Sequence, residues 1–384
     1  MYSLRYVFSI IVLLLLTGNL FSSDREFEKI IDTKFYKLKV ETLLVGLSHP
    51  WCLTFLPDRR MFITERMGNL ILLDSNFQIQ KKISLDALPI YTKGQGGLFD
   101  IAIDRKFKEN NLVYISFNGS PDNKTWGTEL VSAKFLGNEL VNIKPLFKMQ
   151  PKSRSNHHFG GKIILNTQNE LFLTLGDRGE KRQAQILSSH HGSILRLNTD
   201  GTIPSDNPLL ERSRQESTLL EIYSFGHRNV QGIAIHPETE RIWAHEHGPQ
   251  GGDELNLIEP GKNYGWPVIT YGVNYITGTR IGEGTDKQGM EQPTFTWVPS
   301  IGTSGMTFVS GQAFPRWKNN LILGGLKNGH LVRIAIRKNR ISDYETIFEN
   351  KFGRIRDVRQ GPKGDIYLLT DESNGKLLRL TAID

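Results

Sequence analysis

The 384-residue sequence is poor in cysteine. Cys52 is its only thiol, so no intrachain disulfide can form, and no CxxCH motif is present to attach a haem. Because Cys52 follows Trp51 in an apolar segment, we expect it to pack in the core and not to act as a nucleophile.

Several common catalytic motifs are missing as well. The sequence has no GxSxG elbow, Walker loop or Rossmann glycine pattern in a usable context, which argues against serine hydrolases, nucleoside triphosphatases and NAD enzymes. Long runs of lysine and arginine are also missing although the net charge is +7, so nucleic acid is not an expected partner. The positive charge favours a small anionic ligand instead.

The one long apolar run lies at the N-terminus. It covers residues 7–16, follows Arg5 and precedes two serines and an aspartate. A run of this length is typical of a secretory signal peptide and is short for a membrane span. We therefore predict a signal peptide at residues 1–23 and a single mature domain at residues 24–384, exported to a bacterial periplasm without stable membrane insertion. An uncleaved N-terminal anchor is the alternative.

One structural unit recurs along the rest of the chain. Each copy has a short apolar strand, a polar turn, a second strand that ends in a polar cluster with glycine, and a third strand. The strands are rich in β-branched and aromatic residues and are bounded by Pro, Asp, Asn and Gly. Six copies are recognisable, and they begin at Trp51, Gly97, Gly160, Gln231, Gly305 and Asp357.

Six repeated antiparallel sheets predict an all-β fold, a six-bladed β-propeller of four-stranded antiparallel blades. Such a ring leaves no long sheet edge exposed. Residues 38–46 form a strand-like segment before the first full copy, so we expect them to close the ring as the outer strand of the last blade. A β-sandwich or two smaller β domains are the alternatives.

Unusual polar residues occupy two recurring positions of the unit. In a propeller the first strand begins at the end at which the second strand finishes, so residues before strand one and after strand two share a face. We expect them to converge on one rim, where loops on a rigid scaffold build sites. Those before strand one are Gln95, His157, His158, Arg228, Asn229, Arg354 and Arg356, and those after strand two are Asp177, His247, Lys327, Asp371 and Glu372.

Four of these rim residues are cations. Arg228, Lys327, Arg354 and Arg356 would form a positive patch suited to a ligand with several carboxylates or phosphates. For any one of them alone, a solvated or ion-paired loop residue is an equally good interpretation. Their recurrence on one rim favours the ligand.

A glycine-rich segment, HGPQGGDELNLIEPGKNYGWP, offers oxygen ligands. Gly248 and Pro249 can leave their carbonyls free in a tight turn, and Asp253, Glu254 and Tyr264 follow. Oxygen-rich loops of this kind suit a hard cation, calcium and not zinc, although no EF-hand spacing is present.

Histidines occur in three close pairs. The pair His157 and His158 directly precedes two glycines and a strand, and in an arbitrary β-protein such histidines satisfy loop carbonyls. The other pairs would permit zinc but lack a third ligand at convincing spacing, and they are His190 with His191 and His245 with His247.

A series of motifs carries a resemblance to a known family. In chain order they are HHFGGK, LRLNTDGTIPSDNP, FGHRNVQG, EHGPQGGDELN, GKNYGWP, GLK, RIRDVRQGP and LTDESNGKLLRL. From about Trp51 to the C-terminus, the chain resembles the periplasmic aldose sugar dehydrogenases that depend on pyrroloquinoline quinone (PQQ), which are relatives of the soluble glucose dehydrogenases. The fold of that family is a six-bladed propeller, in agreement with the repeats.

The resemblance implies roles for individual residues. It implies His158 as the proton-accepting catalytic base, with His157 shaping the pocket, and Arg228 as a catalytic residue that also contacts PQQ. The other implied PQQ contacts are Gln95, Asn229, Tyr275, Gly325, Leu326, Lys327, Arg354, Ile355 and Arg356. Calcium is implied at Glu254, at Tyr264, and at the carbonyls of Gly248 and Pro249. His247 is a departure, because soluble glucose dehydrogenases carry glutamine there, although the aldose branch resembles this chain.

The activity implied by the resemblance is oxidation of aldose sugars at the anomeric carbon to lactones. A hydride passes to PQQ with calcium assisting, an external acceptor collects the electrons, and a monomer is the default expectation. A calcium-dependent propeller lactonase is the alternative enzyme, but it needs several side-chain oxygens where this rim carries Arg and Lys. A non-enzymatic propeller binding module is the other alternative, and it has no use for a base, a cationic cradle and a calcium loop on one rim.

Overall fold

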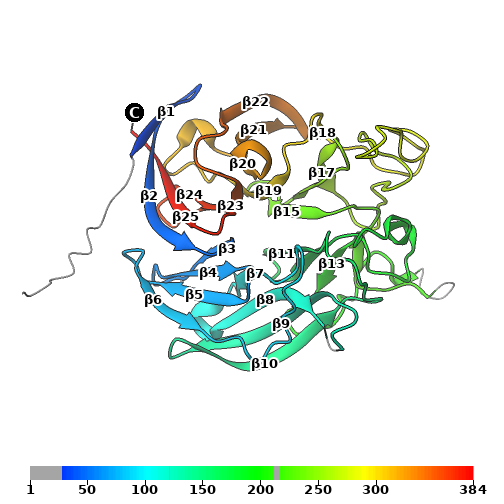
Figure 1. Cartoon of the computed structure of the whole chain (residues 1–384), viewed down its shortest axis with the longest axis horizontal. Helices are drawn as coiled ribbons and strands as arrows, with labels where there is room; N and C mark the ends of the chain where they lie inside the picture. The colour runs from blue at the N-terminus through cyan, green and yellow to red at the C-terminus, as the bar shows by residue number, and fades with distance from the viewer. Residues whose placement is uncertain (1–27, 121, 212–216, 384) are drawn as a thin grey trace, which may run out of the picture.

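The computed structural model describes residues 28–120, 122–211 and 217–383 (Figure 1). The predicted signal peptide, residues 1–23, lies outside the described residues. Within the described ranges, no helix is long and apolar enough to cross a membrane. The helical elements are one turn of α-helix, α1 (Phe107–Asn110), and short 3₁₀ turns such as η1 (Lys181–Gln185), η3 (Pro315–Trp317) and η4 (Lys327–Gly329).

Six antiparallel sheets surround a common centre, which confirms the predicted six-bladed β-propeller (Figure 1). Blades 1 and 2 comprise β3 (Pro50–Phe55), β4 (Met61–Glu65), β5 (Asn69–Leu73) and β6 (Ile79–Ile83), then β7 (Leu98–Ile103), β8 (Leu112–Gly119), β9 (Gly127–Leu136) and β10 (Glu139–Lys148). Blades 3 and 4 comprise β11 (Gly160–Leu165), β12 (Leu171–Leu175), β13 (Ile194–Leu197) and β14 (Ile222–Ser224), then β15 (Val230–Ile235), β16 (Ile242–Glu246), β17 (Asp253–Ile258) and β18 (Phe295–Trp297). Blade 5 comprises β19 (Thr303–Phe308), β20 (Asn320–Gly325), β21 (Leu331–Arg337) and β22 (Arg340–Phe348).

The N-terminal strand closes the ring, as predicted. Blade 6 combines β23 (Ile355–Gln360), β24 (Ile366–Thr370) and β25 (Gly375–Ala382) with β2 (Lys37–Leu47), which pairs antiparallel with β25. In Figure 1 the blue β2 runs beside the red β25. A further strand, β1 (Lys29–Asp32), pairs with β2 and makes this blade five-stranded. Strand pairs from both ends of the chain therefore join the first blade to the last.

The turn between the first and second strands is alike in every blade. A residue with positive φ, the left-handed conformation that suits Asn and Gly best, stands within two residues of the second strand. These residues are Arg59 (φ 72), Asn111 (φ 54), Asn169 (φ 62), Glu240 (φ 55), Asn319 (φ 61) and Gly364 (φ 92). The recurrence explains why the copies share polar turn residues although their sequences diverge.

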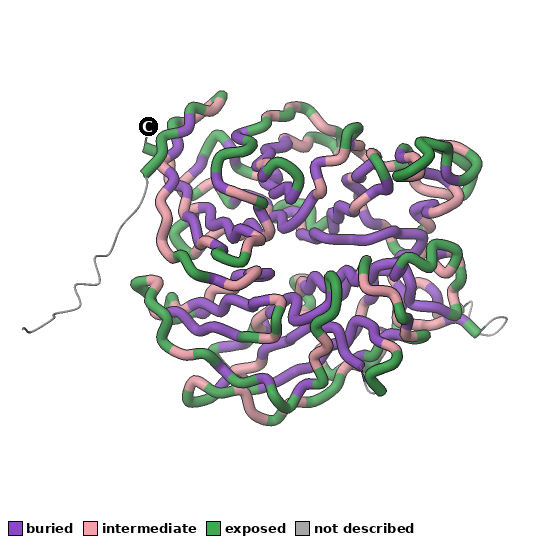
Figure 2. Tube along the Cα trace, in the orientation of Figure 1, coloured by how far each residue is buried: buried purple, intermediate pink, exposed green. Residues whose placement is uncertain are grey.

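The core lies within the blades and between neighbouring blades. Figure 2 shows buried trace in the strands and exposed trace at the peripheral turns. Phe62 of blade 1 meets Phe135 of blade 2 edge-on, with ring centroids 4.9 Å apart, and burying a side chain of this size stabilises the fold by about 1.5–3 kcal/mol. Cys52 is fully buried, and burial raises the pKa of its thiol, so it packs as expected.

Buried and half-buried charges join the inner strands at the centre of the ring. Lys162 Nζ lies 2.8 Å from Asp357 Oδ1, and Arg359 Nε lies 2.9 Å from Asp357 Oδ2. Arg359 also reaches Asp100, with 3.1 Å between its Nη2 and the carboxylate Oδ1. These contacts connect β7, β11 and β23, and the first strand of each blade contacts the first strand of the next around the whole ring. The strand ends are thereby held in a fixed arrangement.

Candidate active site

A cavity of about 540 Å³ opens where the inner strands begin. Every blade contributes to its lining, so it lies on the axis of the ring. Three aromatic side chains form an apolar part of the wall. The ring of Phe99 lies 5.4 Å from that of Trp51 and 5.5 Å from that of Phe159. A flat ligand would find both apolar faces and polar groups here.

Most of the predicted rim residues meet in this cavity. The lining includes residues from before strand one and from after strand two of several blades, as the position of these residues in the repeat predicts. The predicted residues that line it are Gln95, Asn229, His247, Leu326, Lys327, Arg354, Arg356 and Asp371.

The sequence did not predict three of the polar residues that line the cavity, which are His49, Arg66 and Gln231. His49 directly precedes β3, and Arg66 directly follows β4. Both therefore occupy, in the first copy, the same two positions that identified the rim residues in the other copies. The signal was present for these two residues, whereas Gln231 lies inside β15 and has no such signal.

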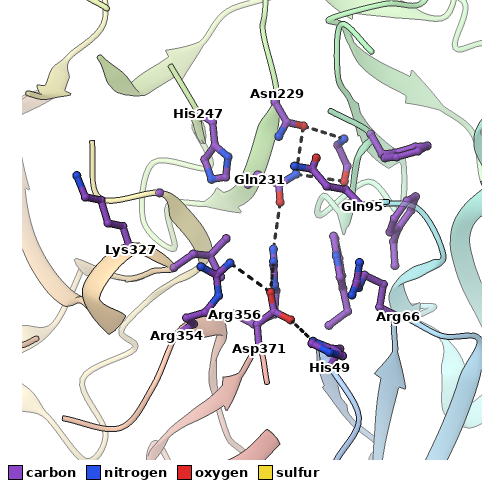
Figure 3. Close-up of a pocket in the computed structure, with 16 residues that line it drawn as sticks. His49, Arg66, Gln95, Asn229, Gln231, His247, Lys327, Arg354, Arg356 and Asp371 are labelled. Carbon is purple, nitrogen blue, oxygen red and sulfur yellow. Dashed lines mark hydrogen bonds and ion pairs between the residues drawn. The ribbon is translucent and has the colours of Figure 1, made fainter. Parts of the chain in front are cut away.

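Asp371 connects several of these side chains (Figure 3). Its Oδ2 accepts a hydrogen bond from Arg356 Nη2 at 2.7 Å and lies 3.6 Å from Arg354 Nη2. Its Oδ1 lies 3.0 Å from His49 Nδ1. Arg356 Nη1 donates to Gln231 Oε1 at 3.2 Å. One carboxylate thus links two arginines and a histidine around the cavity.

The cavity carries a net positive charge. Among the described residues, its lining holds four permanent cations, Arg66, Lys327, Arg354 and Arg356, against the one carboxylate of Asp371, which leaves +3 with neutral histidines. Asp371 stays ionised, because its arginine and histidine partners outweigh the effect of burial and hold its pKa below the ordinary value. Such an excess favours a ligand with several negative charges.

His158 lies at the edge of the cavity and does not line it. Its backbone N–H donates to Gln95 Oε1 at 2.9 Å, and the next two residues, Phe159 and Gly160, line the cavity. The backbone of His158 is left-handed, with φ 57, and a Cβ on the adjacent Gly176 would stand 2.1 Å from its carbonyl oxygen. Glycine is therefore required beside this turn.

Asp177 orients the His158 ring. The distance between His158 Nδ1 and Asp177 Oδ1 is 2.6 Å, and Asp177 also accepts from Trp266 Nε1 and from the backbone N–H of Gly179, each at 2.7 Å. A carboxylate can only accept, so Nδ1 of His158 carries the proton and Nε2 is left as the basic nitrogen. Burial acts to raise the pKa of Asp177, but the interaction with His158, the charge of Arg228 and the hydrogen bond from Gly179 outweigh it and lower the pKa, so the carboxylate is charged.

Burial also determines the charge of His158. Desolvation lowers its pKa to about 4, against the opposing effect of the Asp177 carboxylate. The ring is therefore neutral at ordinary pH and able to accept a proton. His157 packs edge-on against it with ring centroids 4.8 Å apart, and the buried Arg178 donates from Nη1 to the carbonyl of His157 at 2.9 Å.

Arg228 lies behind the lining and not in it. Its guanidinium donates from Nη1 to the carbonyl of His247 at 3.0 Å and lies 5.3 Å from the centroid of the Trp266 ring. Only 7% of the residue is exposed, and its Nε has no hydrogen-bond partner among the described residues. The Nε2 of His247 is 2.6 Å from the carbonyl of Thr303, so this histidine is also held.

Three further residues that were predicted to contact the cofactor do not line the cavity, and they are Tyr275, Gly325 and Ile355. Tyr275 is 65% exposed on the long excursion between β17 and β18. Gly325 ends β20 next to the lining residue Leu326, and Ile355 is fully buried between the lining residues Arg354 and Arg356. Gly325 and Ile355 therefore support neighbours that face the cavity.

The chain is similar to known proteins in sequence and in structure. The Glucose / Sorbosone dehydrogenase family matches residues 47–379. The chain belongs to this family. Aldose sugar dehydrogenase YliI of Escherichia coli (strain K12) is 37% identical to this chain over 352 residues, which cover 90% of this chain and 93% of that protein.

Solved structures of similar proteins agree with the family. A crystal structure of a glucose dehydrogenase has a TM-score of 0.84 and 40% sequence identity, and the match covers 88% of this chain and 98% of that one. The PQQ-bound form of an aldose sugar dehydrogenase from Streptomyces coelicolor has a TM-score of 0.71 and 25% identity, with 90% of this chain and 99% of that chain covered.

A pair of carboxylates stands at the start of the predicted calcium segment, because Glu246 directly precedes the segment and Glu254 lies within it. Glu246 and Glu254 face each other across β16 and β17, and the amide nitrogen of Asn256 lies 3.3 Å from each carboxylate. Burial and the charge of Glu246 raise the pKa of Glu254. The Oδ1 of Asn256 has no partner among the described residues. Glu246 is already bound by His227 Nδ1 at 2.7 Å and by the backbone N–H of Arg228, so Glu254 is the carboxylate that a hard cation would relieve. The oxygen donors of Glu254 and Asn256 fit calcium.

Backbone oxygens would have to complete such a site. In the part of the chain that the structure describes, no three side chains of His, Cys, Asp and Glu gather as a metal set. The hydroxyl of Tyr264 donates to the carbonyl of Leu257 at 2.7 Å, so the main-chain oxygen of Tyr264 is the one left for a cation. The carbonyls of Gly248 and Pro249 stay a prediction from the sequence. Of the candidate zinc pairs, His190 is 2.8 Å from Glu221 and His245 is fully buried.

Proposed function

We propose that this protein oxidises aldose sugars at the anomeric carbon to the corresponding lactones, with bound PQQ and Ca²⁺. One observation carries the proposal, namely a cavity of net charge +3 beside a neutral histidine that an aspartate orients. The family supports sugar oxidation, and the PQQ-bound relative supports the choice of cofactor.

The cavity suits PQQ in charge and in shape. PQQ is a flat tricarboxylate, so its charge would balance the excess of Arg66, Lys327, Arg354 and Arg356 over Asp371. The volume of about 540 Å³ lies within the usual range of small-ligand pockets. Gln95, Asn229 and Lys327 would supply further donors, and the aromatic wall would flank the flat ligand. When bound, PQQ would supply a quinone carbonyl carbon that accepts the anomeric hydrogen as a hydride.

His158 would take the proton that leaves the sugar. Its Nε2 is basic because Asp177 holds the proton on Nδ1, and burial keeps the ring neutral down to about pH 4. Asp177 would then stabilise the protonated ring, since its carboxylate is charged and only 2.6 Å away. Removal of the proton by a fixed, neutral base is what a sugar hemiacetal requires as its hydride departs.

Arg228 would act from behind the lining. Its guanidinium is buried and has an unpaired Nε, so its charge is poorly screened and would stabilise negative charge developing in the cavity. Calcium would add to this through the carbonyls of Gly248 and Pro249, while Glu254 and Tyr264 would hold calcium in their own loop.

The electrons would pass to an external acceptor, because the sequence carries no haem-attachment motif. We propose a monomeric protein in the periplasm, with the N-terminal segment acting as a cleaved signal peptide.

The test is reduction of an artificial dye by purified mature protein with a panel of aldoses. Four mixtures would be compared, with and without PQQ and with Ca²⁺ or Mg²⁺, since Mg²⁺ fits a large oxygen site poorly. We expect dye reduction only with aldose, PQQ and Ca²⁺ together. Failure to oxidise any aldose, combined with failure to bind PQQ, would reject the proposal, and hydrolysis of sugar lactones by the same sample would then identify the lactonase.

A further inference from the structure

We propose that Asp371 is a positioning residue that holds Arg354, Arg356 and His49 as one anion-binding unit and so sets the affinity of the cavity for the carboxylates of its ligand. The inference rests on the proposed function, because it takes PQQ as that ligand.

Asp371 occupies the place where the last blade meets the first. Its backbone N–H donates to the carbonyl of Arg354 at 2.8 Å, and the carbonyl of the next residue, Glu372, accepts from the N–H of His49 at 2.8 Å. The loop after β24 is therefore tied by its backbone to the loops before β23 and before β3. A side chain on this loop has a fixed origin from which to hold both neighbours.

The side chain of Asp371 uses both carboxylate oxygens. One oxygen binds Arg356 at 2.7 Å and lies 3.6 Å from Arg354, and the other lies 3.0 Å from His49. The side chain of Asp371 is only 13% exposed, so water screens these contacts weakly. Figure 3 shows the four side chains gathered on one side of the cavity.

Arg356 is held at two points and Arg354 at one. Besides Asp371, Arg356 binds Gln231, which in turn donates to Asn229 Oδ1 at 3.3 Å. The Nε of Arg356 is buried and has no partner among the described residues. Arg354 is 53% exposed and has only the longer contact to Asp371 among its ion pairs in the described chain. Without the carboxylate of Asp371, Arg354 would lose this ion pair, and Arg356 would keep only its hydrogen bond to Gln231.

Two effects of Asp371 on an anionic ligand oppose each other. Its charge repels the ligand, because it lowers the excess of cavity cations. Its hydrogen bonds fix the arginines in place, so that less side-chain entropy is lost on binding. If charge dominates, removing the carboxylate tightens binding, and if positioning dominates, removal weakens it. The sign of the change therefore distinguishes the two.

The test is a titration of PQQ into the PQQ-free protein with Ca²⁺, followed by the absorbance of PQQ. Asp371→Asn keeps the size of the side chain and removes its charge. We expect it to weaken PQQ binding by roughly tenfold or more, as the loss of a charge-assisted hydrogen bond implies. Asp371→Glu should recover part of the affinity. Unchanged or tighter binding by Asp371→Asn would overturn the proposal.

A matched control comes from the other end of blade 5. Asp343 accepts from Arg333 Nη2 at 2.5 Å and from Lys34 Nζ at 2.9 Å, so it also pairs with two cations. It lies on β22, after the turn that follows β21, and so away from the cavity residue Lys327. Asp343→Asn makes the same change in net charge and should leave PQQ affinity as in the wild type. Equal weakening in both variants would mean that net charge or general stability is responsible, and the proposal would fall.

A second readout needs no cofactor. In the PQQ-free protein, the exchange of the Arg356 Nε–H proton with water, followed by nuclear magnetic resonance, should be faster in Asp371→Asn than in wild type. Unchanged exchange would contradict the holding role. If wild-type protein bound no PQQ, the proposed function would fail, and this exchange rate alone would decide whether Asp371 holds the arginine.

Discussion

Two histidine–aspartate pairs border the same cavity, and they differ in what surrounds the aspartate. Asp177 receives two neutral donors, Trp266 and the backbone of Gly179, in addition to His158. Asp371 receives two arginines in addition to His49. In the first pair the histidine is 16% exposed and in the second 33%. The same two residue types therefore stand in different surroundings.

The partners of each aspartate indicate the role of its pair. The other hydrogen-bond donors to Asp177 are neutral, so His158 is its one ionisable hydrogen-bond partner among the described residues. This suits a base that must become protonated during a reaction. The carboxylate of Asp371 pairs with two arginines, so His49 is only one of its three partners. We infer that the first pair handles a proton and the second holds an anion-binding surface, and the following substitutions should separate the two.

Replacement of His158 should have the largest effect. We expect His158→Ala to lower sugar-dependent dye reduction at least about a hundredfold, the usual scale of general-base loss. Binding of PQQ should be largely intact, because His158 does not line the cavity. Near-normal turnover of the variant, measured at saturating PQQ, would remove His158 from its role.

Replacement of Asp177 should have a smaller effect on the same step. Asp177→Asn keeps the shape but removes the charge and can present a donor to Nδ1, which would place the ring proton on the wrong nitrogen. We expect a loss in turnover of roughly ten- to a hundredfold, with PQQ affinity unchanged. A variant that lost PQQ affinity but kept its turnover would show that the two aspartates have been assigned the wrong way round.

The protonation of His158 offers a test without turnover. Burial lowers its pKa to about 4, so the ring stays neutral as pH falls through the range where free histidine is protonated, and it gains its proton only as pH falls through about 4. Nuclear magnetic resonance of the PQQ-free protein would follow this change. Because the Asp177 carboxylate opposes the shift, Asp177→Asn should lower the pKa further. A midpoint near the ordinary value of 6.5 would contradict the buried, neutral base.

Replacement of His49 should have the smallest effect on turnover. The side chain is one-third exposed and makes one contact with Asp371, so His49→Ala should change turnover by no more than about fivefold. PQQ affinity should weaken, but less than in Asp371→Asn, because both arginines keep their carboxylate. The comparison uses the same titration of PQQ for both variants.

The fold could be predicted because its signals are local and repeated. Polar turns before the second strand, such as the one at Asn169, recur in each copy with one residue in the left-handed conformation. The strand at residues 38–46 stood out because it had no blade of its own, and it does pair with β25. The added strand β1 carries no such signal, since it extends a blade that is already complete.

The site could be predicted only in part. The two recurring positions identified Gln95, Asn229 and Lys327 as facing the cavity, and they would also have identified His49 and Arg66 had they been applied to the first copy. They could not reveal which lining residues bind one another. The contact of Asp371 with His49 joins segments 322 residues apart, and such a pairing arises only when the ring closes.

The most direct test of the difference between the two pairs is a single turnover of PQQ-loaded protein, in which the absorbance of PQQ is followed after rapid mixing with an aldose. His158→Ala and His49→Ala would be compared with wild type, each at saturating PQQ. We predict a rate at least about a hundredfold lower for His158→Ala and a rate within about fivefold of wild type for His49→Ala. Equal losses in the two variants, or a larger loss for His49→Ala, would contradict the division of roles between the two pairs.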